Sequence, residues 1–252
     1  SWILGGGVAP RPAEAWTPQM QAVIAREGAR LAPRDLARQI RRREVRYQAG
    51  VQAPFGENRP EQHYQNPDGT GKLEATIRAE AAAAVAAITQ HRRFDEIVAR
   101  LGRLSHFVAD ANNPLATDTS DRSEGRYFLD YLEYAESAEP RLPLVFYGVP
   151  AALGGKPNRP DFPRFIADMF ARGRDLYPSL GAEYRRINFG SGQAKFDDRS
   201  TAFGVTSLAF SRAVGNVAMA FRAVWLEAGG IDPRKNLAPE GTRIAVIRRE
   251  AR

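Results

Sequence analysis

One stretch of the sequence decides the fold: it reads LGRLSHFVADANNPL and runs from Leu101 to Leu115. Its first part, up to about Ala111, is the second half of a predicted helix that begins at Phe94. Apolar residues recur every three or four positions in this helix. Pro114 lacks the backbone N–H that a helix interior needs and therefore ends the pattern. The stretch predicts a long amphipathic helix with one face in the core.

The same stretch carries the residues that point to chemistry. His106 and Asp110 are four positions apart, so their side chains leave the same face of a helix. An imidazole and a carboxylate one turn apart can hold a metal ion, and the same pair also makes surface salt bridges. Arg126 and Asp130 repeat this spacing further along, and His63 opens the loop segment HYQNPDG.

Helical spacing of apolar residues continues through most of the chain. It predicts further helices over 18–31, 33–47, 73–91, 124–135, 162–176, 178–187 and 200–227. Residues 50–71 are rich in Pro, Gly, Asn and Gln and are predicted to form a long functional loop. Residues 242–249 are predicted to form a short strand or a tail. We therefore expect an all-α protein with a single multi-helix domain over residues 16–252.

The composition excludes several classes of site. The 252 residues include no cysteine, which rules out disulfides, thiolate zinc sites, iron–sulfur clusters and cysteine nucleophiles. The three histidines, His63, His91 and His106, cannot build a histidine-rich multinuclear centre. No apolar run of transmembrane length occurs in the sequence.

The charge balance has two interpretations. The net charge is +7, and only four of the 36 basic residues are lysine. A positive surface suits nucleic acid or another anion, and the basic stretch at Arg38, Arg41–Arg43 and Arg46 is the candidate for such binding. An arginine-rich, lysine-poor composition is also typical of a GC-rich genome.

The N-terminal residues predict export. Ala13-Glu14-Ala15 has the A-x-A pattern of a bacterial-type signal-peptidase site, and Trp16 would be the first mature residue. Residues 1–15 are accordingly expected to be the remnant of a signal peptide or a disordered tail. The predicted location is the periplasm or the extracellular space.

Three segments together resemble the zinc-dependent phospholipase C and single-strand-specific nuclease superfamily. The central helix fits L-G-x-x-x-H-[FY]-x-x-D-x-x-x-P-[LM], the loop at His63 is similar to H-F-Y-D-P, and Trp16 is similar to the family's mature N-terminal tryptophan. Order and spacing agree from Trp16 to about Tyr134. The resemblance implies the all-α fold of that superfamily, built around a trinuclear zinc centre that cleaves phosphodiesters.

The resemblance also implies a set of metal ligands, and only part of that set is present. The matching residues are His63, His106, Asp110, Asp130 and, if cleavage frees its amine, Trp16. Other ligand positions hold Gln21, Ala116 and Arg126, and no carboxylate lies within residues 47–51. At most one well-formed zinc site is expected, made by the first three of the matching residues. Asp110 is also the candidate catalytic residue.

Arg126 suggests how the lost metal is replaced. We hypothesise that its guanidinium stands where a zinc ion would sit and pairs with Asp110 and Asp130. The alternative is a solvent-facing salt bridge with Asp130 alone.

Two functions follow from this pattern. The first is an exported, non-catalytic binding or structural subunit with a degenerate zinc site, whose partner is a phosphate-ester ligand or another protein. The alternative is a zinc-dependent phosphodiester hydrolase, of phospholipase C or nuclease type, that works with a reduced metal centre.

Overall fold

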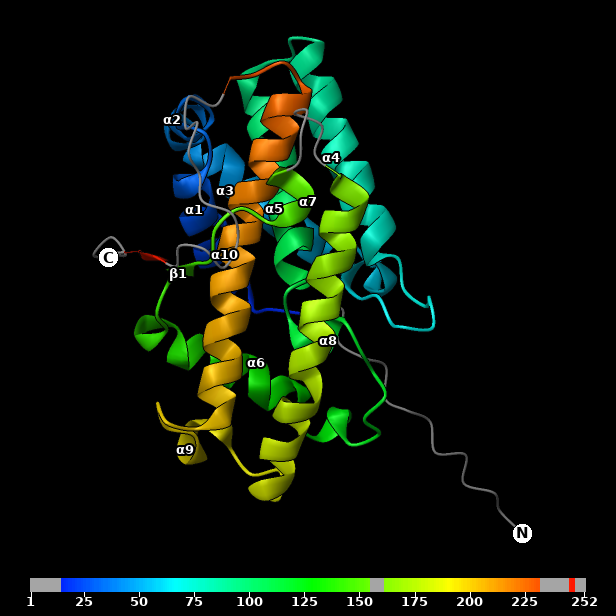
Figure 1. The fold of residues 1–252 in the computed structure, drawn as a ribbon, viewed down its shortest axis with the longest axis vertical. Helices are drawn as coiled ribbons and strands as arrows, with labels where there is room; N and C mark the ends of the chain where they lie inside the picture. The colour runs from blue at the N-terminus through cyan, green and yellow to red at the C-terminus, as the bar shows by residue number, and fades with distance from the viewer. Residues whose placement is uncertain (1–14, 155–160, 232–244, 248–252) are drawn as a thin grey trace.

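The computed structural model describes residues 15–154, 161–231 and 245–247. The predicted all-α fold is confirmed (Figure 1). The α-helices are α1 Pro18–Leu31, α2 Arg34–Arg42, α3 Glu44–Gln52, α4 Leu73–Thr89, α5 Phe94–Asp110, α6 Phe128–Ala138, α7 Ala151–Gly154, α8 Phe162–Arg186, α9 Gly192–Lys195 and α10 Thr201–Glu227. Short 3-10 helices cover Ala53–Gly56, Pro60–His63, Pro114–Ala116, Glu124–Arg126 and Glu139–Arg141.

The two β-strands among the described residues are short and antiparallel. β1, Val145–Phe146, pairs with β2, Ala245–Val246. β2 falls within the predicted short strand at 242–249, of which the structure describes only residues 245–247. No helix of the described residues is both long enough and apolar enough to cross a membrane.

The predicted bounds of α1 are confirmed, and those of α10 differ by one residue at the start; local chemistry explains both. The Thr17 side chain accepts a hydrogen bond from the Met20 N–H at 3.2 Å, and Pro18 occupies the first turn of α1. Ser200 caps α10 in the same way, through a 3.1 Å bond from the Phe203 N–H. Gly229, with φ of 85°, follows the end of α10.

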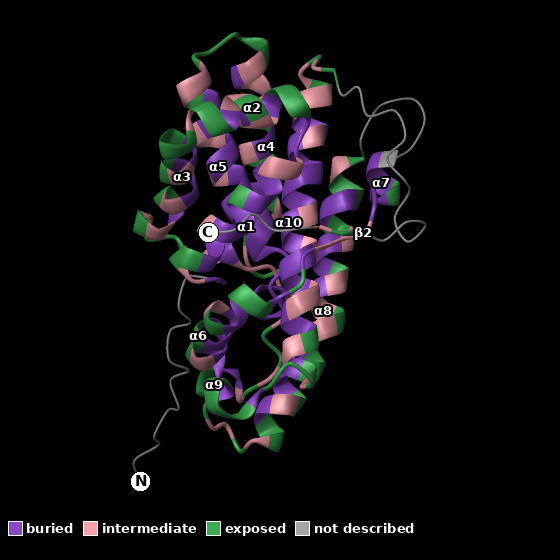
Figure 2. Ribbon diagram, turned by 90° about the vertical axis from the view of Figure 1, so that its left-hand side faces the viewer, coloured by how far each residue is buried: buried purple, intermediate pink, exposed green. Residues whose placement is uncertain are grey.

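Helix α5 is the central element of the bundle. It packs against α1, α3, α4 and α10, and its residues are almost continuously buried from Leu104 to Asp110. Figure 2 shows buried residues along these helices and exposed residues on the outward faces of α2, α3 and α8. The polar side chains of Ser105, His106 and Asp110 therefore lie inside the bundle, where each needs an internal partner.

Helices α3 and α5 meet at two glycines. A methyl group on Gly102 would lie 2.3 Å from the Tyr47 carbonyl oxygen, and one on Gly50 would lie 2.1 Å from the Ala99 carbonyl oxygen. Such separations are too short for a carbon and an oxygen that are not bonded to each other, so only glycine permits this approach of the two backbones. The close approach brings the end of α3 against His106.

One helix prediction was wrong at a proline. The two helices predicted on either side of Pro178 form one helix, α8. Proline removes one backbone hydrogen bond and usually breaks a helix. Here buried tyrosines hold both halves in line, because Tyr177 donates to Glu124 at 2.5 Å and Tyr184 donates to Asp130 at 2.7 Å.

Two other boundaries also differ from the predictions. The helix predicted over 33–47 is split at Arg43, whose φ of −129° is not helical. Arg43 turns away to pair with Asp95 at 3.0 Å, with its guanidinium 5.3 Å from the centre of the Phe94 ring. The long loop predicted at 50–71 begins only after Gln52, and two 3-10 helices give it order.

We predict that Gly102→Ala destabilises the protein by about 2–3 kcal/mol, because the new methyl group forces α3 and α5 apart. Urea unfolding followed by circular dichroism measures this effect. Gly204→Ala is the matched control, since Gly204 lies in α10 and its added methyl group would meet no atom within 4 Å. That control should be neutral or stabilising by up to about 1 kcal/mol. Equal losses in the two variants would contradict the role of the glycine contact.

Candidate metal centre

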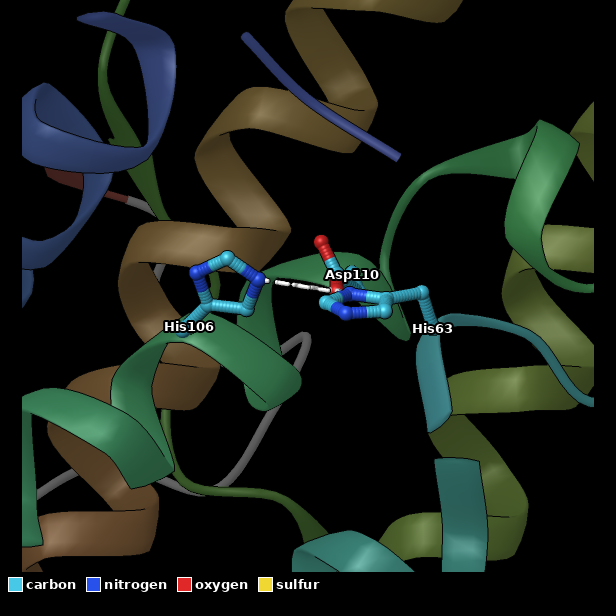
Figure 3. Close-up of side chains that lie close together, drawn as sticks. All are labelled: His63, His106 and Asp110. Atoms are coloured by element: carbon cyan, nitrogen blue, oxygen red, sulfur yellow. Dashed lines mark hydrogen bonds and ion pairs between the residues drawn. The ribbon is translucent and has the colours of Figure 1, made fainter. Parts of the chain in front are cut away.

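Three of the residues predicted as metal ligands converge in the core. His106 and Asp110 come from α5, and His63 comes from the end of the 3-10 helix Pro60–His63 (Figure 3). Asp110 Oδ2 lies 2.8 Å from His63 Nδ1 and 3.4 Å from His106 Nε2, and the two nitrogens are 3.3 Å apart. The exposed fraction is 4% for His63 and 0% for the other two.

His106 is oriented by the end of α3. Its Nδ1 lies 2.8 Å from the Val51 carbonyl oxygen, which can only accept a hydrogen bond. Nδ1 therefore carries a proton, and Nε2 is the atom that faces Asp110 and His63. A backbone carbonyl behind a histidine is the usual way in which a metal-binding imidazole is held in place.

His63 is positioned by the loop that follows it. The Gln65 N–H donates to the Ala116 carbonyl oxygen at 2.9 Å, and the Leu73 N–H donates to the Tyr64 carbonyl oxygen at 3.2 Å. Gly71, with φ of 95°, lets the returning chain pass close to Tyr64. The chain that follows His63 is thereby fixed.

The three facing atoms fit a small cation. Without a proton, all three carry lone pairs directed at one another, so either a shared proton or a cation must lie among them. Ligands in tetrahedral zinc sites, with bonds of about 2.0–2.1 Å, are about 3.3–3.4 Å apart. Two of the three separations already match this value, and only the pair His63–Asp110, at 2.8 Å, would have to widen.

Burial and hydrogen bonding act in opposite directions on Asp110. Complete burial alone would raise the pKa of this carboxyl, but the attraction of His106 and the hydrogen bonds from His106 and His63 outweigh it. The pKa of Asp110 is held below its ordinary value. The group at the centre of the cluster is therefore a carboxylate.

Gln21 occupies the other side of that carboxylate. Its Nε2 donates to Asp110 Oδ1 at 2.6 Å and, more weakly, to the His106 carbonyl oxygen at 3.3 Å. Gln21 is fully buried, and its Oε1 has no hydrogen-bond partner among the described residues. An amide N–H therefore occupies the carboxylate oxygen that the two histidines leave free.

Trp16 lies beside the end of α5. It is fully buried, its indole Nε1 donates to the Ala109 carbonyl oxygen at 2.9 Å, and its ring packs against Tyr131. The side chain of Asn113 donates to the Ala15 carbonyl oxygen. Trp16 is thus held next to the cluster through its indole and the preceding peptide, and residues 1–14 lie outside the described part of the chain.

The structure does not bring Asp130 and Arg126 to this cluster. Asp130 Oδ1 accepts from the Tyr184 hydroxyl at 2.7 Å and from the Gly192 N–H at 2.8 Å. The exposed Arg126 lies over the Phe189 ring, with its guanidinium carbon 3.7 Å from the ring centre. Arg126 belongs to a 3-10 turn and Asp130 to α6, so the predicted single-helix spacing does not hold.

The prediction that Arg126 pairs with Asp110 is therefore wrong. Gln21, which the resemblance marks only as a lost ligand, makes that contact. The position of Gln21, one turn into the helix that follows Trp16, was the available signal. Nothing in the sequence marked Val51, because its contribution is a backbone oxygen.

We predict that Gln21→Leu lowers the free energy of unfolding by about 2–3 kcal/mol, since it leaves a buried carboxylate oxygen without its donor. Gln19→Leu is the matched control, because Gln19 lies on the same helix and is exposed. The control should change stability by no more than about 0.5 kcal/mol. Urea titrations of the two variants without added metal make the comparison, and equal losses would show that the amide contact is unimportant.

No family model and no curated protein matches this sequence. Among solved structures, an alpha toxin from Clostridium absonum matches with a TM-score of 0.59 and 14% identity, covering 85% of this chain and 64% of the toxin chain. The alpha toxin of an avian strain of Clostridium perfringens matches with a TM-score of 0.52 and 14% identity, covering 88% and 66%. This chain therefore spans slightly less than two thirds of either toxin, and it shares the all-α fold of the toxin region that it matches.

Proposed function

We propose that this protein binds one zinc ion through His63, His106 and Asp110 and is a non-catalytic relative of the phospholipase C and nuclease superfamily. The observation that carries the proposal is the hydrogen bond from Gln21 to Asp110 Oδ1. It leaves one carboxylate oxygen for a metal and occupies the other with an uncharged donor.

The donor set supports zinc in particular. Two imidazole nitrogens and one carboxylate oxygen are common zinc ligands, and the chain offers no thiolate. The Val51 carbonyl would keep His106 in the tautomer whose Nε2 can bind the ion. Bound zinc would supply a divalent charge that holds α5 and the His63 loop together.

The same contacts argue against catalysis. Phosphodiester hydrolysis in multi-zinc enzymes needs metals that activate water and neutralise developing charge together. Here a second metal would have to displace Gln21, and its other expected ligands are absent at Ala116 and Arg126. The three remaining ligands are buried, which limits access for a phosphodiester.

A phosphodiester hydrolase remains the second candidate because of the number of ligands. Catalytic zinc sites commonly have three protein ligands and leave a fourth position for water, and the cluster has three. In that case Asp110 would act beside the reacting water. Activity measurements separate the two candidates.

We expect the purified protein to bind zinc in a ratio of about one ion per chain, as measured by mass spectrometry of metals after dialysis. His106→Asn and His63→Asn should each weaken zinc binding by at least about 100-fold, because each removes a ligand. His91→Asn is the matched control, since His91 is exposed and its positive φ suits asparagine. Equal binding by all variants would contradict the assignment.

We predict that the zinc-loaded protein does not hydrolyse bis(4-nitrophenyl) phosphate above the uncatalysed rate. Zinc at a free concentration 100 times its Kd should nevertheless raise the free energy of unfolding by about 2.7 kcal/mol. Hydrolysis that requires zinc and disappears in His106→Asn would overturn the non-catalytic assignment in favour of the second candidate.

We also propose that the protein is exported and cleaved after Ala15. The support is the A-x-A pattern before Trp16. Cleavage would free the amine of Trp16 close to the end of α5, where the indole already lies. Expression of the complete precursor in a bacterium and N-terminal sequencing of the exported form should give Trp16 as the first residue. Another first residue would exclude the Trp16 amine as a ligand.

A further inference from the structure

A cavity lies toward the C-terminal end of α1, between α1, α2 and α3. Its volume is about 590 Å³, within the range of about 300–1,000 Å³ typical of small-molecule sites. The charged residues that line it are Arg26, Arg30, Arg34, Arg38, Arg41 and Glu44. Gln21 precedes Arg26 and Arg30 on α1 by about 8 and 14 Å of helix, so this cavity is separate from the metal centre.

The arginines gather here because of helical spacing. Arg26 and Arg30 are four positions apart on α1, as are Arg34 and Arg38 on α2, so each pair shares one helix face. The turn at Arg43 folds α3 back and adds Glu44 to the wall. Five cations therefore surround the cavity against one carboxylate.

Few acidic groups neutralise these cations. Arg30 pairs with Glu27 at 2.8 Å, and Arg38 has a longer, exposed contact with Asp35 at 3.7 Å. Within the described part of the chain, no ion pair is found for Arg26, Arg34 or Arg41. Five guanidinium groups that line one cavity with so few counter-charges repel one another, and an anion among them would relieve this repulsion.

The start of α2 adds to the positive potential. Arg34 is the first residue of this helix, and the preceding Pro33 provides no side-chain cap for the first N–H groups. The positive end of a helix favours anions. Arg34 and Ala32 place this end in the wall of the cavity.

We propose that this cavity binds a small anion that carries two or more phosphate groups. Guanidinium groups bind phosphate oxygens through paired hydrogen bonds, and arginines from two helices can contact separate phosphates. An extended nucleic acid fits less well, because the neighbouring exposed Arg42 and Arg46 do not line the cavity. The site is independent of the metal centre and of the proposed function.

Isothermal titration calorimetry with inorganic tripolyphosphate tests the proposal. Arg34→Gln/Arg41→Gln should weaken binding by about 100-fold, at about tenfold for each arginine. Arg42→Gln/Arg46→Gln is the matched control, because it removes the same charge from exposed positions on α2 and α3 that lie outside the cavity. The control should weaken binding by less than about threefold. Equal weakening in both, or no saturable binding, would overturn the proposal.

Further titrations identify the source of the phosphates and the rival ligand. Inorganic phosphate should bind at least tenfold more weakly than tripolyphosphate, since it engages fewer arginines. Phosphatidylcholine vesicles doped with phosphatidylinositol bisphosphate should bind, and tripolyphosphate should displace them, if the natural source is a lipid headgroup. Absence of vesicle binding beside saturable tripolyphosphate binding indicates a soluble anion. Single-stranded DNA that binds more tightly than tripolyphosphate, and equally to both double variants, would overturn the proposal.

Discussion

The structure depends on the buried carboxylate of Asp110. A carboxylate that is fully shielded from water lowers the stability of the fold by several kcal/mol unless each of its oxygens faces a hydrogen-bond donor or an opposite charge. His63 and His106 face one oxygen and Gln21 donates to the other, so the compensation comes from the His63 loop, α5 and α1. The polar cluster therefore requires these three segments to meet at one point, whether a proton or a metal ion lies among the ligands.

The surrounding bundle provides this meeting point through close backbone contacts. Gly50 and Gly102 let α3 approach α5 until the Val51 carbonyl reaches His106. At the other end of α5, the Trp16 indole binds the Ala109 carbonyl and fixes the beginning of α1, from which Gln21 reaches Asp110. Changes in packing at the glycines or at Trp16 would therefore act on the chemistry of the cluster.

The arginines fall into groups with different roles. Arg43 and Arg103 make ion pairs that join separate elements, with Asp95 in one case and with Glu57 and Glu80 in the other. A different group lines the cavity at α1 and α2 with few counter-charges. A preference for arginine over lysine, which is typical of a GC-rich genome, does not by itself gather five arginines around one cavity.

The sequence by itself determined the features that depend on residues close together in the chain. The apolar period of α5, the caps of α1 and α10, and the shared face of His106 and Asp110 all depend on residues within one or two turns. Tertiary structure alone decided the rest. Gln21 meets Asp110 across 89 positions, Arg126 packs on Phe189 instead of on a carboxylate, and tyrosine contacts carry α8 through Pro178. Local periodicity encodes which face of a helix is buried, but the partner of a buried polar group depends on how distant helices pack against one another.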